Sequence, residues 1–163
     1  MKNLKKQFRV FFLAIVAVTF SACNNDDDVV AEDTSAAGES LIAKIDGADF
    51  NAMEISIVAT TSNNVLSITG GDSNGNTFQM AIQNYTGEGT YVTGDAITNS
   101  SGLTYITISP VGSWSSTLDI GNGMLEVTSD ADGIIEGTFE FDGYNGPSNR
   151  KQFREGAFKA NIE

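Results

Sequence analysis

The chain has no histidine, one cysteine and two prolines among its 163 residues. The lack of histidine excludes Ser-His-Asp and Cys-His catalysis and nearly all catalytic zinc sites, because each needs an imidazole. A single cysteine excludes a disulfide within the chain. Nucleotide-binding glycine motifs and the G-x-S-x-G nucleophile pattern are also missing from the sequence. We therefore expect no enzymatic activity, no cofactor and no metal.

Basic residues are scarce and unevenly placed. The chain has nine Lys and Arg against 21 Asp and Glu, and every acidic residue follows Cys23. Loss of residues 1–22 would leave five basic and 21 acidic residues, a net charge of −16. A protein this acidic is repelled by phosphate groups, so the composition excludes nucleic acid as a partner.

Residues 1–22 have the three parts of a signal peptide. Lys2, Lys5, Lys6 and Arg9 form a positive start, and an apolar run of 11 residues over 10–20 follows. That run is too short to cross a bilayer, which needs about 20 apolar residues. The run has the length of a signal-peptide core and ends at small residues, so we predict cleavage between Ala22 and Cys23.

The residues around the cleavage point, Phe20-Ser21-Ala22-Cys23, resemble the lipobox of bacterial lipoproteins, with Phe20 in place of the usual leucine. The resemblance implies that Cys23 carries lipid and that its thiol is therefore consumed. Several acyl chains would then hold the protein on a membrane, since one chain alone binds weakly. The alternative is that Cys23 is an ordinary thiol after a conventional secretory signal.

Residues 23–39 are polar, acidic and without periodicity, which is typical of a flexible tether. The run Asn24-Asn25-Asp26-Asp27-Asp28 resembles the acidic signal that exports lipoproteins of Bacteroidota to the cell surface. A plain solvated spacer explains the same residues equally well. We expect an outer-membrane lipoprotein of the cell envelope, facing either the periplasm or the cell surface.

From residue 40 onward the chain consists of short segments in which apolar and polar residues alternate. Alternation with one polar face is typical of half-buried antiparallel strands, and pairs such as Asp46-Gly47 and Asp132-Gly133 supply tight turns. The sequence predicts one all-β domain over 40–163, a β-sandwich or partly closed β-barrel of about eight or nine strands. The alternation places Met53, Ile55, Phe78, Met80, Ile106, Ile108, Phe139 and Phe158 on buried faces.

Four motifs in this region consist mainly of glycines and aromatic residues. The motifs are Ile42-Ala43-Lys44-Ile45-Asp46-Gly47 followed by Phe50, Gly87-Glu88-Gly89-Thr90-Tyr91, Gly133-Ile134-Ile135-Glu136-Gly137-Thr138-Phe139-Glu140-Phe141, and Glu155-Gly156-Ala157-Phe158. With these motifs, the residues over 41–163 resemble a family of small Bacteroidota lipoproteins of unknown function, and that resemblance implies no catalytic residue.

Acidic side chains offer two candidate sites. Glu136, Glu140 and Asp142 share one face of a predicted strand, as a carboxylate pair for glycoside hydrolysis would require, but such a face is usually solvated. The run 72–76 and the pair Asp130 and Asp132 have the oxygen groups that calcium prefers. Their spacing departs from an EF-hand, so we interpret both as turn residues.

Aromatic and basic residues offer the binding sites. Trp114 and Tyr144 could stack a sugar ring or anchor a partner protein, although we favour a Trp114 that caps the core. Arg150, Lys151 and Arg154 could hold a carboxylate or phosphate ligand, although we favour a role in neutralising the acidic surface.

These observations favour a non-catalytic binding or interaction module at the cell envelope. Its expected contacts are the membrane, through lipid on Cys23, and a protein or glycan partner. The alternative is a lipocalin-like carrier of a small apolar ligand. That carrier would need an interior cavity lined by Met53, Ile55, Phe78, Met80, Phe139 and Phe158.

Overall fold

The computed structural model of the protein describes residues 38–163. The predictions for the signal peptide, for Cys23 and for the tether up to residue 37 lie outside the described residues. Over 38–163, no helix is long and apolar enough to cross a membrane.

Residues 38–163 form eleven strands, which confirms the all-β class. Strands outnumber the expected eight or nine because β2 and β6, with four and five residues, are too short to show clear alternation. The strands are β1 (Ser40–Ile45), β2 (Ala48–Asn51), β3 (Val58–Ser62), β4 (Val65–Gly71), β5 (Thr77–Gln83), β6 (Gly89–Thr93), β7 (Gly102–Ile108), β8 (Val111–Thr117), β9 (Asn122–Ala131), β10 (Ile134–Tyr144) and β11 (Arg150–Asn161).

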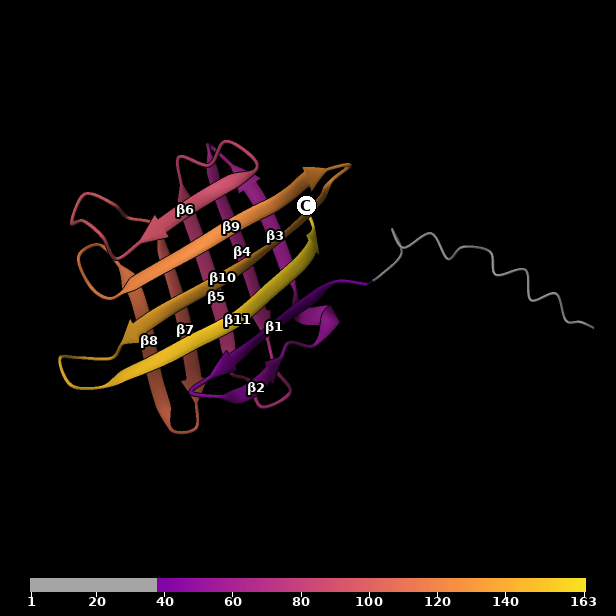
Figure 1. Ribbon diagram of the computed structural model, residues 1–163. Helices are drawn as coiled ribbons and strands as arrows, with labels where there is room; N and C mark the ends of the chain where they lie inside the picture. Colours follow the sequence, from indigo (N-terminus) through magenta and orange to yellow (C-terminus); the bar gives the residue numbers. More distant parts are fainter. Residues whose placement is uncertain (1–37) are drawn as a thin grey trace, which may run out of the picture. The chain divides into compact units, whose positions relative to one another are not determined.

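The sheet curls on itself into two layers (Figure 1). Strands run antiparallel in the order β2-β1-β11-β10-β8-β7-β5-β4-β3, and β9 pairs with β10 on one edge and with β6 on the other. The front layer in Figure 1 holds β6, β9, β10, β11 and β1, and the strands β3, β4, β5, β7 and β8 lie behind it.

Short contacts join the two layers at their margins. At one margin, Tyr144 of β10 pairs with Ser115 of β8. At the other, Ile162 bridges Ala59 of β3, and the Glu163 N–H donates a hydrogen bond to Ala59 O at 2.9 Å. The architecture is therefore a partly closed barrel, one of the two architectures between which the alternation could not decide.

Aromatic rings fill the space between the layers. Phe78 is fully buried, and its ring packs against five others at centroid distances from 4.7 to 6.2 Å. Most of these contacts are edge-to-face, the arrangement that aromatic quadrupoles favour. The five rings belong to Phe50, Tyr105, Phe139, Phe141 and Phe153.

Two glycines let the rings of Phe139 and Phe158 lie close to the sheet. In the β10–β11 ladder, Gly137 pairs with Phe158, and Phe139 pairs with Gly156. A Cβ atom at Gly137 would lie 2.6 Å from the Phe158 ring, and one at Gly156 would lie 2.7 Å from the Phe139 ring. Because each ring occupies the place of a side chain on the facing strand, glycine is required there.

Residues 53–57 do not form the strand that the alternation predicts. Glu54–Ser56 form a 3₁₀ helix, η2, and Ile55 is 92% exposed. The backbone turns because the Ser56 N–H donates to Met53 O at 2.9 Å and Ser56 Oγ accepts the Gly71 N–H at 2.9 Å. Met53 and Ile55 are therefore surface residues, while Ile57 alone of the three is buried.

In strand β7, the buried face is the opposite of the one that the alternation predicts. Leu103 and Tyr105 face the core, whereas Ile106 is half-buried and Ile108 is 60% exposed. Successive strand residues point to opposite faces, so only one of the two neighbours Tyr105 and Ile106 can be inside. Tyr105 is inside because its ring packs on Phe78 at 5.0 Å.

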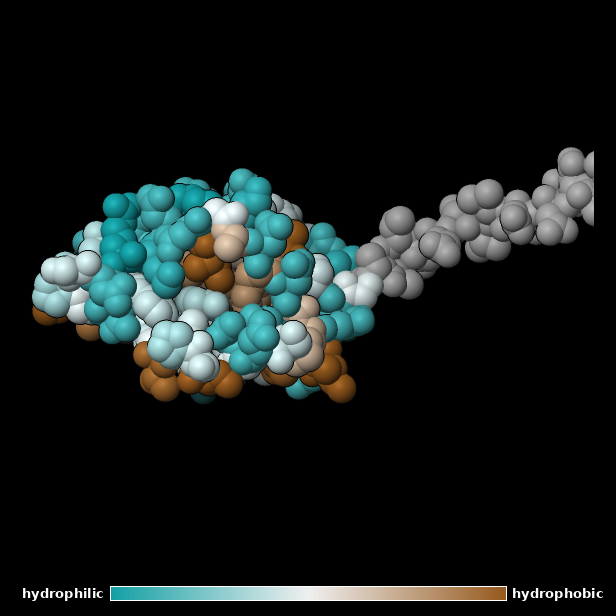
Figure 2. All heavy atoms as spheres, turned by 90° about the horizontal axis from the view of Figure 1, so that it is seen from below, coloured by the Kyte–Doolittle hydropathy of each residue, from teal (hydrophilic) through white to brown (hydrophobic). Residues whose placement is uncertain are grey.

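Within the strands, charge is confined to one layer. Strands β3, β4, β5, β7 and β8 contain no charged residue, whereas β1 contains one lysine, β9 and β10 contain acidic residues alone, and β11 contains both signs. Residues 38–163 hold five basic and 16 acidic residues, a net charge of −11. Figure 2 shows hydrophilic side chains mainly on the upper side of its view and hydrophobic ones along the lower edge.

Candidate recognition surface

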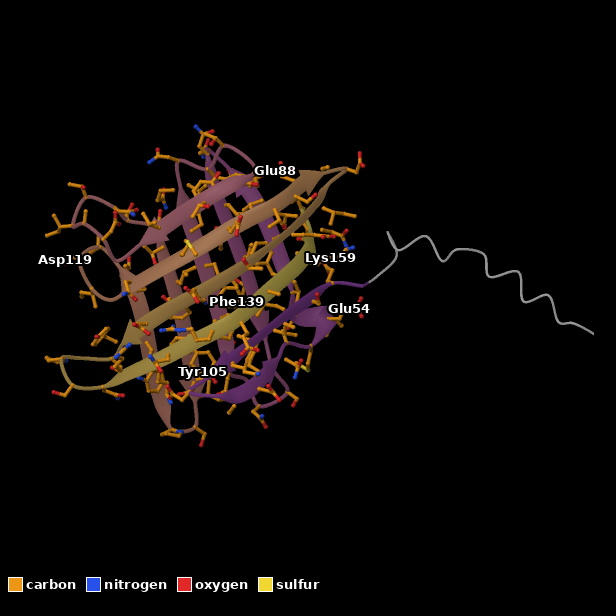
Figure 3. All side chains as sticks on the ribbon, viewed as in Figure 1. Glu54, Glu88, Tyr105, Asp119, Phe139 and Lys159 are labelled. Carbon is orange, nitrogen blue, oxygen red and sulfur yellow. The ribbon has the colours of Figure 1, made fainter. Side chains whose placement is uncertain are left out.

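Three loops meet at one end of the barrel, on the left in Figure 1. They are residues 94–101 between β6 and β7, 118–121 between β8 and β9, and 145–149 between β10 and β11. The first two are joined by backbone hydrogen bonds from Ala96 N to Leu118 O (2.9 Å) and from Leu118 N to Asn99 O (3.1 Å). We call this region the loop end; Figure 3 labels Asp119 there.

The loop end contains a largely apolar hollow of about 410 Å³. Tyr144 is half-buried beside it, and Ile120 is 49% exposed. Further exposed apolar side chains, Ile97 and Leu118, lie on the adjoining loops. We call this feature the Tyr144 hollow, and its lining comprises Asp119, Ile120, Gly121, Tyr144, Gly146 and Pro147.

Leu118 has a backbone conformation that is costly for its side chain. Its φ of +54° lies in the left-handed region, which branched side chains rarely adopt. The two hydrogen bonds to residues 96 and 99 hold it in that conformation. Strain of this kind persists only where the surrounding structure imposes it, and such residues often occur at functional sites.

Trp114 belongs to the core and does not add to the exposed surface. The residue is 7% exposed, and its ring centroid lies 6.2 Å from that of Tyr105. The indole N–H donates to Asn149 Oδ1 at 3.0 Å, and Lys151 Nζ lies 5.1 Å from the ring centroid. The predicted capping role is confirmed, so Trp114 is not an exposed contact and Tyr144 is the aromatic residue at the hollow.

The basic cluster is occupied by carboxylates of the same domain. Arg150 and Arg154 each bind Asp142 at 2.6 Å, and Lys151 binds Asp46 at 2.9 Å. The Asp142 side chain is 11% exposed. An incoming carboxylate or phosphate would have to compete with these partners, so the arrangement agrees with charge neutralisation rather than a ligand site.

Three aspartates have hydrogen bonds that stabilise their ionised form. Burial alone would raise the pKa of Asp142, but hydrogen bonds from Arg154 and Arg150 hold that pKa below its usual range. Burial is likewise outweighed at Asp46, where Gln152 N–H and Lys151 lower the pKa, and at Asp72, where Asn76 and Asn74 lower it. A carboxyl group whose pKa is lower in the folded state than in the unfolded state stabilises the fold at pH values above its unfolded-state pKa. That stabilisation is lost as the pH falls through the folded-state pKa.

Acid should therefore unfold the protein, and Asp142 should account for part of the effect. We expect stability to change little between pH 6 and 8, since the chain lacks histidine, and to fall below about pH 4. At pH 7, Asp142→Asn should lower the free energy of unfolding by about 2 kcal/mol, because two charged hydrogen bonds weaken. Urea unfolding between pH 3 and 7 measures both effects. A deficit in the variant that stayed constant down to pH 3 would contradict this assignment.

The other carboxylates of β10 have separate surroundings. Glu136 pairs with Lys159 at 2.9 Å, whereas Glu140 is exposed. Asp142 is enclosed by its two arginines instead. The three carboxylates that the alternation placed on one face therefore have three different environments.

The predicted oxygen clusters serve as turn and packing groups. Asp72 Oδ1 accepts the N–H groups of Asn74 (2.8 Å) and Asn76 (2.9 Å), and Asp130 Oδ2 accepts the Tyr85 hydroxyl at 2.7 Å. Burial, reinforced by Asp130, raises the pKa of that hydroxyl. Within residues 38–163, no group of three or more Cys, Asp or Glu side chains is placed to hold a metal ion.

Sequence reasoning identified Tyr144 but missed its neighbours Ile120 and Pro147. Both lie in segments rich in glycine and asparagine, which indicated turns and nothing more. Ile120 and Pro147 come close to Tyr144 because β8 pairs with β10, and no local sequence pattern predicts that pairing.

Comparison with known proteins gives one family match, a domain of unknown function (DUF6252), over residues 38–160. No curated protein and no solved structure matches the chain. The match covers all but the last residues of the barrel, and the chain therefore belongs to the DUF6252 family.

Proposed function

We propose that the protein is a non-catalytic interaction module, held by lipid on Cys23 at the bacterial outer membrane, that binds a partner protein through the Tyr144 hollow. The observation that carries this proposal is the hollow itself. It combines a half-buried tyrosine with Ile120 and Pro147, at a loop end that also exposes Ile97 at 71%.

The chemistry of the hollow favours a protein over a glycan. Tyrosine packed with aliphatic side chains is typical of the centre of a protein interface, where an apolar side chain of the partner is buried. A sugar would need several polar groups around its ring, whereas Asp119 is the one charged side chain in the lining. The strained Leu118 beside the hollow adds support, because it fixes the shape of the surface before a partner arrives.

The lipid anchor is supported by the lipobox-like residues before Cys23, and the outer-membrane location by the acidic run Asn24-Asn25-Asp26-Asp27-Asp28 after it. A tethered domain reaches partners on the same membrane at high effective concentration, so a modest hollow is enough for binding.

The carrier alternative has less support. Of the six residues that would line its cavity, Ile55 and Met53 are on the surface. The other four, Phe78, Met80, Phe139 and Phe158, belong to the core between the two layers.

Crosslinking in intact cells tests the proposed function. A photoreactive amino acid placed at Ile120, which lines the hollow and is 49% exposed, should give a covalent adduct with a protein of defined mass. Adding Tyr144→Ala should lower the yield of that adduct about tenfold, because truncating a central aromatic residue removes much of the binding energy. Adducts are measured by immunoblotting and identified by mass spectrometry.

The matched control places the same photoreactive group at Gln79, an exposed residue of β5 in the uncharged layer. We expect no such adduct there. Equal adducts at both positions, or an adduct from Ile120 that Tyr144→Ala leaves unchanged, would contradict the proposal.

A further inference from the structure

One edge of β6 has no neighbouring strand among residues 38–163, since β6 pairs with β9 alone. On the free side, Val92 O accepts a hydrogen bond from Asn99 Nδ2 at 2.9 Å. Alternate residues of a strand direct their N–H and C=O groups to the same side. Because Val92 O faces away from β9, Thr90 and Val92 present their backbone groups to the free edge, whereas Tyr91 between them directs its groups toward β9.

A second hollow, of about 430 Å³, runs beside this edge. Gln83 and Asn84, at and just after the end of β5, lie on its other side. Its lining consists mainly of amide and hydroxyl groups, which can bond to a peptide backbone as well as to water. We call it the β6 groove, and its lining is Gln83, Asn84, Thr90, Tyr91, Val92, Asp95, Ala96, Thr98, Asn99, Ser100 and Ser101.

The free edge is held firmly in place. At the end of β6, the buried hydroxyls of Thr93 and Ser116 share a hydrogen bond of 2.7 Å, which ties β6 to β8 in the other layer. Near its start, the Tyr91 hydroxyl donates to Gly87 O at 2.6 Å. An incoming strand would therefore meet a preformed template and lose little binding energy to ordering it.

Charge around the groove favours a basic occupant. Asp95 lines the groove, and Glu88 directly precedes β6, where Figure 3 labels it. The lining contains no basic residue. The five basic residues of 38–163 all bind carboxylates elsewhere, in the pairs Lys44–Glu155, Arg150–Asp142, Lys151–Asp46, Arg154–Asp142 and Lys159–Glu136.

We infer that the β6 groove receives an extended, basic segment of a partner protein, which pairs with the free edge of β6 as an additional strand. Backbone hydrogen bonds to Thr90 and Val92 supply affinity, and lysine or arginine side chains pair with Glu88 and Asp95. The inference rests on the proposed function in taking the partner to be a protein, and it adds the mode of recognition and the chemistry of the segment.

The test uses the full chain purified in detergent and a short synthetic peptide of alternating lysine and valine that carries a fluorophore. Fluorescence anisotropy should show saturable binding. Val92→Pro should weaken it about tenfold, because proline removes a donor from the free edge, a position where strands tolerate proline. Val92→Thr, which keeps the N–H group, should bind as the wild type does.

Two further peptides make the outcome decisive even if Val92→Pro fails to fold. A lysine–valine peptide with an N-methyl group on every residue cannot donate a backbone hydrogen bond from either edge, and we expect it to bind the wild-type chain about tenfold more weakly. A glutamate–valine peptide should not bind. Equal binding of the methylated and unmethylated peptides, or of the glutamate peptide, would overturn the inference.

The peptide measurement is independent of the Tyr144 hollow. We expect Tyr144→Ala to bind the lysine–valine peptide normally. Loss of peptide binding together with an intact crosslink at Ile120 would therefore reject the β6 groove and leave the proposed function in place. Peptide binding without the crosslink would reject the hollow instead.

Discussion

Replacing Phe78 with alanine should lower the free energy of unfolding by about 3–5 kcal/mol, the range for large-to-small changes at buried aromatic residues. Phe78 is fully buried and touches five rings that come from both layers. These rings cannot all collapse into the space left by one side chain, so a cavity remains. A domain is stable by only about 5–15 kcal/mol, and this one variant would remove much of that margin.

Urea unfolding, followed by fluorescence, measures this effect. Trp114 is the single tryptophan of the chain and is buried in the same core, so its emission reports the transition. Val111→Ala, at a residue 88% exposed, is the matched control and should change stability by less than about 0.5 kcal/mol. A Phe78→Ala midpoint equal to that of Val111→Ala would show that the rings do not pack as described.

Replacing Cys23 with serine should abolish the attachment of lipid to the protein entirely. Serine lacks the thiol on which the lipid is built, and each buried CH₂ of an acyl chain contributes about 0.8 kcal/mol of membrane affinity. Metabolic labelling with a fatty-acid analogue, combined with membrane fractionation, measures both the lipid and its consequence. Wild-type protein should carry the label and sediment with membranes.

Phe20→Leu is the control for this second prediction, since it brings the segment before Cys23 nearer to the usual lipobox and keeps the cysteine. That variant should be labelled and retained like the wild type. Wild-type protein without label, or Cys23→Ser protein that still carries the label, would mean that Cys23 is not the site of lipid attachment.

Alternation in the sequence was a sound guide where one face of a strand is polar. Residues 135–141 show it, since Ile135, Phe139 and Phe141 are buried in β10 as expected. At Ile55 the same pattern misled, because the contact that turns the chain comes from Gly71, far along the sequence. At Tyr105 and Ile106 two apolar neighbours competed, and packing against Phe78 decided between them.

The candidate site could be predicted only in part for a similar reason. Tyr144 stood out as an aromatic residue before a loop of glycine, proline and asparagine. The role of Arg150 and Arg154 in neutralising acidic groups could also be predicted, because both lie on the strand that follows Asp142. The free edge of β6 could not be predicted, because a strand is known to lie at an edge only when the pairing of all the strands is known.

The distribution of charge gives the domain a preferred orientation near any negatively charged surface. Strands β1, β9, β10 and β11 together carry five basic and six acidic residues, a net charge of −1, and strands β3, β4, β5, β7 and β8 carry none. The remaining ten acidic residues of 38–163 lie in β2 and outside the strands, so repulsion acts mainly on the connecting segments, within about 8 Å at physiological salt. Beside anionic headgroups or another acidic protein, the domain would therefore turn a face of its sheet inward and its loops toward water.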